Sequence, residues 1–188
     1  MIPKIIHQIW IGPNKVPENI QKLMNEVKEK TPGFEYKFWS EKELEEEFNK
    51  EYIQNIINKS LHIVFATNVF RLKILEKFGG IYLDADTKIV QPLENLYQKY
   101  KNKKLVSIKD GRILPDNSVI FAEKGIDYSF AIIDYKFNEP FAFYWQRMKP
   151  EVFNKEDVGK EGRYLQDVCL NSWVPAYQNY HNKKIQIK

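Results

Sequence analysis

The chain has 188 residues, of which 43% are hydrophobic and 29% charged, a composition typical of soluble globular proteins. Its length suits one domain with a substantial core, so we expect residues 1–188 to form a single domain. The net charge of +4 is too small, and the basic residues are too evenly spread, to predict binding to nucleic acid.

Three features bear on the compartment in which the chain works. Cys169 is the single cysteine, which excludes an internal disulfide and fits a reducing compartment. A strand-like segment follows Met1 directly, and no apolar run approaches the length of a membrane span. We therefore expect a cytoplasmic protein without a secretion signal, and a peripheral contact with the inner face of the cell membrane stays open.

Strand-like and helical patterns alternate along the chain. The apolar run 2–11 predicts a buried first strand that ends at Gly12, and His7 within it is expected to be packed and hydrogen-bonded rather than a ligand. Ser40 and Glu43 form a capping box, which predicts a helix that begins at Ser40. The expected elements are further strands at 34–39, 81–83, 88–90, 105–108 and 118–122, and helices from 17, from 40, and at 52–58, 63–78, 126–137, 140–148 and 164–171. This alternation predicts an α/β sandwich with a mainly parallel sheet.

The most informative stretch is residues 66–93. A helical pattern stops at Gly79-Gly80, and a short apolar strand then leads to Asp84 and Asp86. The first glycine can supply the left-handed residue that ends the helix. Because side chains two apart on a strand share a face, both carboxylates are expected to converge at the strand's carboxyl end, where open α/β sheets bind ligands.

These two carboxylates have a chemistry that suits a cation. Adjacent acids repel each other unless a positive charge neutralises them, and hard oxygen donors suit Mg²⁺ or Mn²⁺ bridged to a diphosphate. An isolated Asp-x-Asp is also common in turns after strands, so the signal depends on its context. After a double glycine and an apolar strand, the pair indicates an enzyme that uses a metal–nucleotide-sugar complex.

Three segments resemble one known family. Residues 2–12, residues 66–93 and, more softly, residues 116–125 (DNSVIFAEKG) are similar to the sugar-binding region of the DXD-containing glycosyltransferases. That group includes yeast-type α-mannosyltransferases, bacterial capsule and lipo-oligosaccharide transferases and, more distantly, the glucosylating clostridial toxins. The resemblance covers roughly the first two-thirds of the chain.

The resemblance implies a fold and an activity. The implied fold is of GT-A type, with a mainly parallel sheet flanked by helices. The implied activity is the transfer of a hexosyl group from a nucleotide sugar, such as a UDP- or GDP-sugar, with retention of the anomeric configuration and with Mn²⁺ or Mg²⁺ as cofactor. The implied acceptor is a saccharide, a lipid-linked saccharide or a protein, as in polysaccharide biosynthesis.

The resemblance also implies roles for single residues. Asp86 corresponds to the acid that ligates the metal, and Asp84 to the acid that contacts the donor and reaches the metal through water. Tyr82 lies where the family has an aromatic residue in contact with the donor. Ile9 and Trp10 lie where the nucleotide base packs, with the indole face stacking on it; the alternative for Trp10 is a core side chain at the end of a buried strand.

Arg71 interrupts the apolar face of the helix that precedes the double glycine. A Ser-Asp-x-x-Arg pattern on this helix binds the donor sugar and diphosphate in the family, and a guanidinium suits bidentate contact with phosphate. The alternative is a surface ion pair with Glu76, at a spacing that is poor for one. The chain departs from the pattern at Thr67-Asn68, because Asn68 can bind a sugar hydroxyl but carries no charge. Asn68 and Arg71 are expected to face the two acids together.

The second departure lies near the C-terminus. The His- and Trp-containing segment that closes the site in the family is matched only by residues 171–173 and His181, so a reduced or truncated lid is expected. Two other functions stay open. One is a degenerate module that binds a nucleotide sugar or carbohydrate without turnover. The other is a Mg²⁺-dependent phosphohydrolase, in which a threonine usually lies two places after the second Asp, whereas here Thr87 follows it directly.

Overall fold

The computed structural model of the protein describes residues 1–60, 63–108, 116–128, 151–154, 156–159 and 162–167. Its helices are α1 (Glu18–Lys30), α2 (Glu41–Phe48), α3 (Lys50–Lys59), α4 (Ile63–Phe78) and α5 (Leu93–Tyr100). Its strands are β1 (Ile5–Ile9), β2 (Glu35–Trp39), β3 (Gly80–Leu83), β4 (Thr87–Ile89), β5 (Leu105–Ile108), β6 (Asp116–Ala122), β7 (Glu151–Val152), β8 (Val158–Gly159) and β9 (Leu165–Asp167). No helix within the described ranges is long and apolar enough to cross a membrane.

The central sheet has the strand order β2-β1-β3-β6-β5-β7. Strand β1 runs parallel to β2 and β3, and β5 runs parallel to β7. Strand β6 is antiparallel to both of its neighbours, β3 and β5, so it alone runs against the common direction of this sheet as described. The predicted α/β class with a mainly parallel sheet is confirmed.

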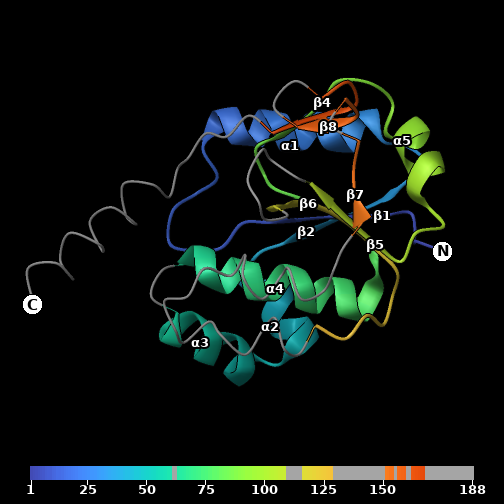
Figure 1. The fold of residues 1–188 in the computed structure, drawn as a ribbon. Coiled ribbons are helices and arrows are strands. Elements are labelled where there is room, and N and C mark those ends of the chain that lie inside the picture. The colour runs from blue at the N-terminus through green and yellow to red at the C-terminus, as the bar shows by residue number, and fades with distance from the viewer. Residues whose placement is uncertain (61–62, 109–115, 129–150, 155, 160–161, 168–188) are drawn as a thin grey trace, which may run out of the picture.

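Helices cover both faces of this sheet (Figure 1). One face packs against α2, α3 and α4, and its cluster includes Tyr82 and Trp39. The other face packs against α1, α5 and a smaller sheet of order β4-β9-β8, and its cluster includes Ile6, Ile81 and Leu83. Because side chains alternate along each strand, Tyr82 points toward α4 while its neighbours in sequence point the opposite way.

The double glycine is required by close packing. Gly79 has a φ of 65° and Gly80 a φ of 102°, a region that residues with a side chain rarely adopt. A Cβ atom on Gly79 would lie 2.6 Å from the backbone nitrogen of Lys124, and one on Gly80 would lie 2.6 Å from the carbonyl oxygen of Ile5. The backbone N–H of Gly79 donates to Leu75 at 2.8 Å, which closes the last turn of α4. The two glycines therefore set the path from α4 into β3.

Most predicted elements occur within a few residues of their expected bounds, and the capping box of Ser40 and Glu43 is present. Helix α5 was not expected, although Leu93, Leu96 and Tyr97 bury one helical face behind Pro92 at the N-cap. The prediction of a helix at 164–171 is wrong where the chain is described, because Leu165 pairs with Ile89 as part of β9. A local pattern does not reveal such a distant partner.

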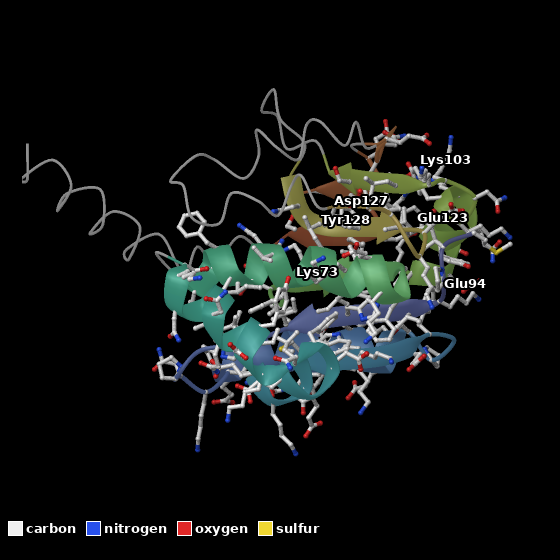
Figure 2. All side chains as sticks on the ribbon, turned by 90° about the horizontal axis from the view of Figure 1, so that it is seen from below. Lys73, Glu94, Lys103, Glu123, Asp127 and Tyr128 are labelled. Carbon is white, nitrogen blue, oxygen red and sulfur yellow. The ribbon has the colours of Figure 1, made fainter. Side chains whose placement is uncertain are left out.

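The helix predicted at 126–137 is also wrong at its start. Residues 126–128 are not helical, and the buried Tyr128 packs in the cluster that contains the inner side chains of α4 (Figure 2). Residues 129–137 of this prediction, and the whole helix predicted at 140–148, lie outside the described residues.

Candidate active site

The site is built where β1 and β3 end and β6 begins. Because β6 runs against β3, its first residues lie beside the end of β3, and Leu83 pairs with Val119. The backbone N–H of Asp84 continues this pairing by donating to the carbonyl of Ser118 at 2.8 Å. Asn117 is therefore brought beside the Asp84–Asp86 segment from a distant part of the chain.

Asp84 and Asp86 lie in a turn, not on an extended strand. Strand β3 ends at Leu83, and the backbone N–H of Thr87 donates to the carbonyl of Asp84 at 3.0 Å. Strand alternation therefore does not orient the two acids, because the extended strand ends at Leu83. Both acids are half-buried at the carboxyl edge of β3, as expected.

Arg71 reaches this turn from the middle of α4. Its side chain is buried, and its Nη1 lies 3.2 Å from Oδ1 of Asp84. The guanidinium carbon lies 4.4 Å from the centre of the Tyr82 ring, so the cation stacks on an aromatic face. Glu76 pairs instead with Lys73, at 2.7 Å, and the alternative of an Arg71–Glu76 surface pair is wrong.

Tyr82 contacts the charged side chains of both Arg71 and Asp84. Its hydroxyl donates to Oδ1 of Asp84 at 2.7 Å. Burial raises the pKa of Tyr82 well above its usual value; the nearby Arg71 opposes this rise, and Asp84 and Asp86 add to it. The hydroxyl therefore stays protonated, and it serves as a hydrogen-bond donor to the first acid rather than as a base.

Asn117 is a site residue that the sequence reasoning missed. Nη1 of Arg71 donates to the Asn117 backbone carbonyl and, at 3.1 Å, to its Oδ1. The Asn117 amide group donates in turn to Oδ1 of Asn68, at 3.4 Å. Asn68 and Arg71 thus do share a face directed at the site. The weaker family resemblance at residues 116–125 includes Asn117. That Asn117 is the residue that meets α4 follows only from the antiparallel pairing of β6 with β3.

Ile9 and Trp10 lie at the end of β1. Ile9 is a core residue, whereas Trp10 is half-buried, so the alternative that Trp10 is a core side chain is wrong. The indole N–H of Trp10 donates to the carbonyl of Asn14 at 2.9 Å, and its backbone N–H donates to Trp39 at 3.0 Å. The bond to Asn14 restricts the orientation of the indole.

His7 is the packed residue that the sequence predicted. Trp39 donates its indole N–H to Nδ1 at 3.1 Å, so Nε2 carries the proton and donates to the carbonyl of Gly79 at 3.0 Å. Burial lowers the pKa of His7 to about 4, a shift that the bond to Gly79 opposes and the nearby Lys37 assists. The ring is neutral at physiological pH and ties β1 to the start of β3.

The donor set fits a divalent cation that also binds a ligand. Within the described parts of the chain, no group of three or more His, Cys, Asp or Glu side chains gathers to hold a metal. Two carboxylates of one turn are the kind of partial site that Mg²⁺ or Mn²⁺ completes with water and phosphate oxygens. The expected lid residues, 171–173 and His181, lie outside the described residues.

The fold is that of known glycosyltransferases. The chain is similar to the solved PaToxG glycosyltransferase, with a TM-score of 0.57 and 18% identity, over 78% of this chain and 70% of that one. At this identity the likeness concerns the fold alone, and the fold is of GT-A type.

Part of the chain is similar in sequence to one family of glycosyltransferases. Residues 17–103 match the family described as the glycosyltransferase sugar-binding region containing DXD motif. An uncharacterized glycosyltransferase of Acanthamoeba polyphaga mimivirus is 35% identical over 91 residues, which are 46% of this chain and 36% of that protein. Inositol phosphoceramide mannosyltransferase 3 of Schizosaccharomyces pombe is 32% identical over 97 residues, which are 50% of this chain and 27% of that protein.

These matches confirm the resemblance read from the sequence. Residues 17–103, which include α1 to α5, are similar to a glycosyltransferase sugar-binding region containing a DXD motif. The chain covers only about a third of the length of the curated relatives it matches.

Proposed function

We propose that the chain is a metal-dependent glycosyltransferase that moves a hexosyl group from a nucleotide sugar to a hydroxyl acceptor. One observation carries this proposal: a buried arginine, Arg71, meets the first acid of the Asp-x-Asp turn at the carboxyl edge of the sheet. A buried cation beside two half-buried carboxylates suits a site that must hold both a metal ion and a diphosphate.

Asp86, with Asp84 beside it, would hold Mn²⁺ or Mg²⁺. The ion would supply charge neutralisation for the diphosphate of the donor. Asp84 already accepts hydrogen bonds from Tyr82 and from the backbone at Thr87, so its position is set before any ligand arrives. A carboxylate that is already held in place loses little conformational entropy when a ligand binds.

Arg71 would bind the diphosphate and offset the negative charge that develops on it as the glycosidic bond breaks. Asn117 accepts a hydrogen bond from Arg71 and donates one to Asn68, and the two amide groups offer donors and acceptors for sugar hydroxyls. The neutral Asn68 is the feature that favours the second candidate, a module that binds a nucleotide sugar without turnover.

Ile9 and Trp10 would bind the nucleotide base. The N–H of the Trp10 indole is already used by Asn14, so the ring has its face, and not its polar edge, to offer a base. Stacking of this kind is tolerant of base identity. Both UDP- and GDP-sugars are therefore proposed as donors.

No residue at the described part of the edge stands out as a covalent carboxylate nucleophile. A same-face attack by the acceptor hydroxyl, assisted by a phosphate oxygen of the donor, is the more economical course and gives retention. The proposed acceptor is a saccharide, a lipid-linked saccharide or a protein. Because one relative carries the name of a mannosyltransferase, GDP-mannose belongs among the donors to be tested.

A donor screen tests this proposal. UDP- and GDP-sugars are added with and without Mn²⁺, and thermal unfolding, hydrolysis and transfer to simple glycosides are measured together. A ligand that binds only the folded state raises the unfolding midpoint by mass action. Mn²⁺-dependent stabilisation with hydrolysis or transfer supports the enzyme; stabilisation with neither favours the binding module; release of inorganic phosphate from phosphate esters favours a phosphohydrolase.

A further inference from the structure

Gln8 is a fully buried amide in the middle of the central sheet. It lies on β1, two residues after Ile6, and therefore faces the α1 side of the sheet, opposite the side on which Arg71 and Tyr82 meet. A buried amide costs free energy unless its groups are hydrogen-bonded, and an aliphatic side chain would fill this space without that cost. The hydrogen bonds of the Gln8 amide therefore call for an explanation beyond packing.

The Gln8 side chain reaches the backbone of the Asp-x-Asp turn. Its Nε2 donates to the carbonyl oxygen of Asp84 at 3.1 Å, and its Oε1 accepts from the hydroxyl of Tyr36 at 2.9 Å. The same Asp84 carbonyl accepts the N–H of Thr87, the bond that closes the turn. Tyr36, Gln8 and the turn thus form one hydrogen-bonded chain that crosses β2, β1 and β3.

Asp84 is consequently held from both faces of the sheet. On the α4 side, Arg71 and Tyr82 contact its carboxylate. On the α1 side, Gln8 contacts its backbone carbonyl. The first set of contacts must be shared with a bound ligand, whereas the second can remain unchanged throughout binding.

Tyr36 is suited to orient the amide. Burial raises its pKa to about 12, so the hydroxyl keeps its proton and donates it to Oε1 of Gln8 at any physiological pH. That bond fixes which end of the amide faces the turn, because Oε1 is already engaged and Nε2 must point to Asp84.

We propose that Gln8 and Tyr36 are positioning residues that hold the Asp84–Thr87 turn in the geometry that binds the metal and diphosphate. The inference rests on the proposed function. Groups that orient metal ligands without touching the metal commonly change metal affinity when they are removed. Gln8 and Tyr36 would act in this way through the backbone of the turn.

The test compares three variants. Gln8→Met removes both hydrogen bonds while keeping an unbranched side chain, and Tyr36→Phe removes only the outer one. Tyr97→Phe is the matched control, because it also removes a single hydroxyl that bonds near β1, to the carbonyl of Ile2 at 2.8 Å, but at the far end from the turn. The affinity for Mn²⁺ is measured by the electron paramagnetic resonance signal of the free ion, in the presence of UDP and separately of GDP.

We expect Mn²⁺ affinity to fall about 10-fold in Gln8→Met, by less in Tyr36→Phe, and not at all in Tyr97→Phe. Exchange of the Thr87 amide hydrogen, measured without metal, should be faster in the first two variants only. A role limited to stability would lower the unfolding midpoints of Tyr36→Phe and Tyr97→Phe alike and leave the affinity for Mn²⁺ unchanged.

The possible failures are distinguishable. If the wild-type chain does not bind Mn²⁺ in the presence of UDP or in the presence of GDP, the proposed function is wrong, and this inference is wrong with it. If the wild type binds Mn²⁺ and Tyr36→Phe binds it as tightly as Tyr97→Phe, the positioning role is overturned while the proposed function stands. The Tyr36→Phe comparison decides the matter even if Gln8→Met does not fold.

Discussion

Two ionic clusters in this protein bury their charges in opposite ways. At the candidate site the cation is buried, with the Arg71 side chain 4% exposed, while its partner Asp84 is 30% exposed at the edge of the sheet. In the second cluster the acid is buried: Asp157 is 1% exposed and lies 2.9 Å from both Lys99 and Arg163, whose side chains are 42% and 48% exposed.

The difference lies in what each cluster can still bind. Two cations cover a single carboxylate at Asp157, and Tyr100 adds a long hydrogen bond, so this acid has its full set of partners. At the candidate site Arg71 pairs with Asp84 in a turn that also carries Asp86. The Asp157 cluster fastens the segment around β8 to α5, whereas the turn at the site brings two carboxylates of the kind that bind a divalent cation.

The largest effect is expected from Arg71→Lys. An ammonium group cannot reproduce the forked contact with Asn117 and Asp84, nor the stacking on Tyr82. We expect turnover of the donor to fall by about 100-fold or more, the usual scale for loss of one group that stabilises charge in the transition state. Steady-state kinetics measure this, with the unfolding midpoint as control; unchanged turnover in a folded variant would remove Arg71 from the mechanism.

Trp10→Ala tests whether this indole stacks on the nucleotide base. Loss of base stacking should weaken nucleotide binding by about 1–3 kcal/mol, while binding of a sugar phosphate without a base should change little. Because Trp10 is half-buried, the ligand-free variant should still fold. Calorimetric titration with UDP and with a sugar phosphate gives the comparison, and equal losses for both ligands would show that Trp10 does not contact the base.

Asp157→Asn tests whether the Asp157 cluster contributes to stability without affecting the candidate site. We expect a fall of a few degrees in the unfolding midpoint and no change in Mn²⁺-dependent binding of nucleotide. Burial alone would raise the pKa of Asp157, but hydrogen bonds from Lys99 and Arg163 outweigh it and hold the pKa below its usual value.

The stability that this lowered pKa gives is present above the ordinary Asp pKa of about 3.9 and is lost as the pH falls through the lower folded value. The gap in unfolding midpoint between wild type and variant should therefore narrow below about pH 4. A gap that widens on acidification would contradict this role, and weaker binding of Mn²⁺ at neutral pH would show that the clusters are not independent.

The smallest effect is expected from Asn68→Asp. Oδ1 of Asn68 accepts a hydrogen bond from Asn117, and a carboxylate accepts it equally well, so the fold should be unchanged. The added charge should shift the preference among donor sugars or raise turnover a few-fold. If the wild type shows neither transfer nor hydrolysis and this variant shows either, the binding-module alternative is correct for the native chain.

The sequence predicted the parts of the site that are local and missed those that depend on distant pairing. The path from α4 through Gly79 and Gly80 to Asp84 could be read directly, because cap, turn and strand signals follow one another within a single stretch. Asn117 could not be identified, because it meets Arg71 only through the reversed direction of β6.

The same reason explains the errors in the fold. Leu165 belongs to a strand because it pairs with Ile89, and no local periodicity contains that information. Gln8 offers a different lesson. A polar residue inside an apolar strand was visible in the sequence, and such a residue should be expected to have a partner; only the structure shows that the partner is the backbone of the Asp-x-Asp turn.

The most direct test of the account is the thermal shift of Asp86→Asn with Mn²⁺ and a nucleoside diphosphate. We expect UDP or GDP to raise the unfolding midpoint of the wild type only when Mn²⁺ is present. This shift should disappear in Asp86→Asn, because one of few protein ligands is lost. Asp157→Asn, the matched control, should keep the full shift from a lower starting midpoint. An undiminished Mn²⁺-dependent shift in Asp86→Asn would show that Asp86 does not hold the metal.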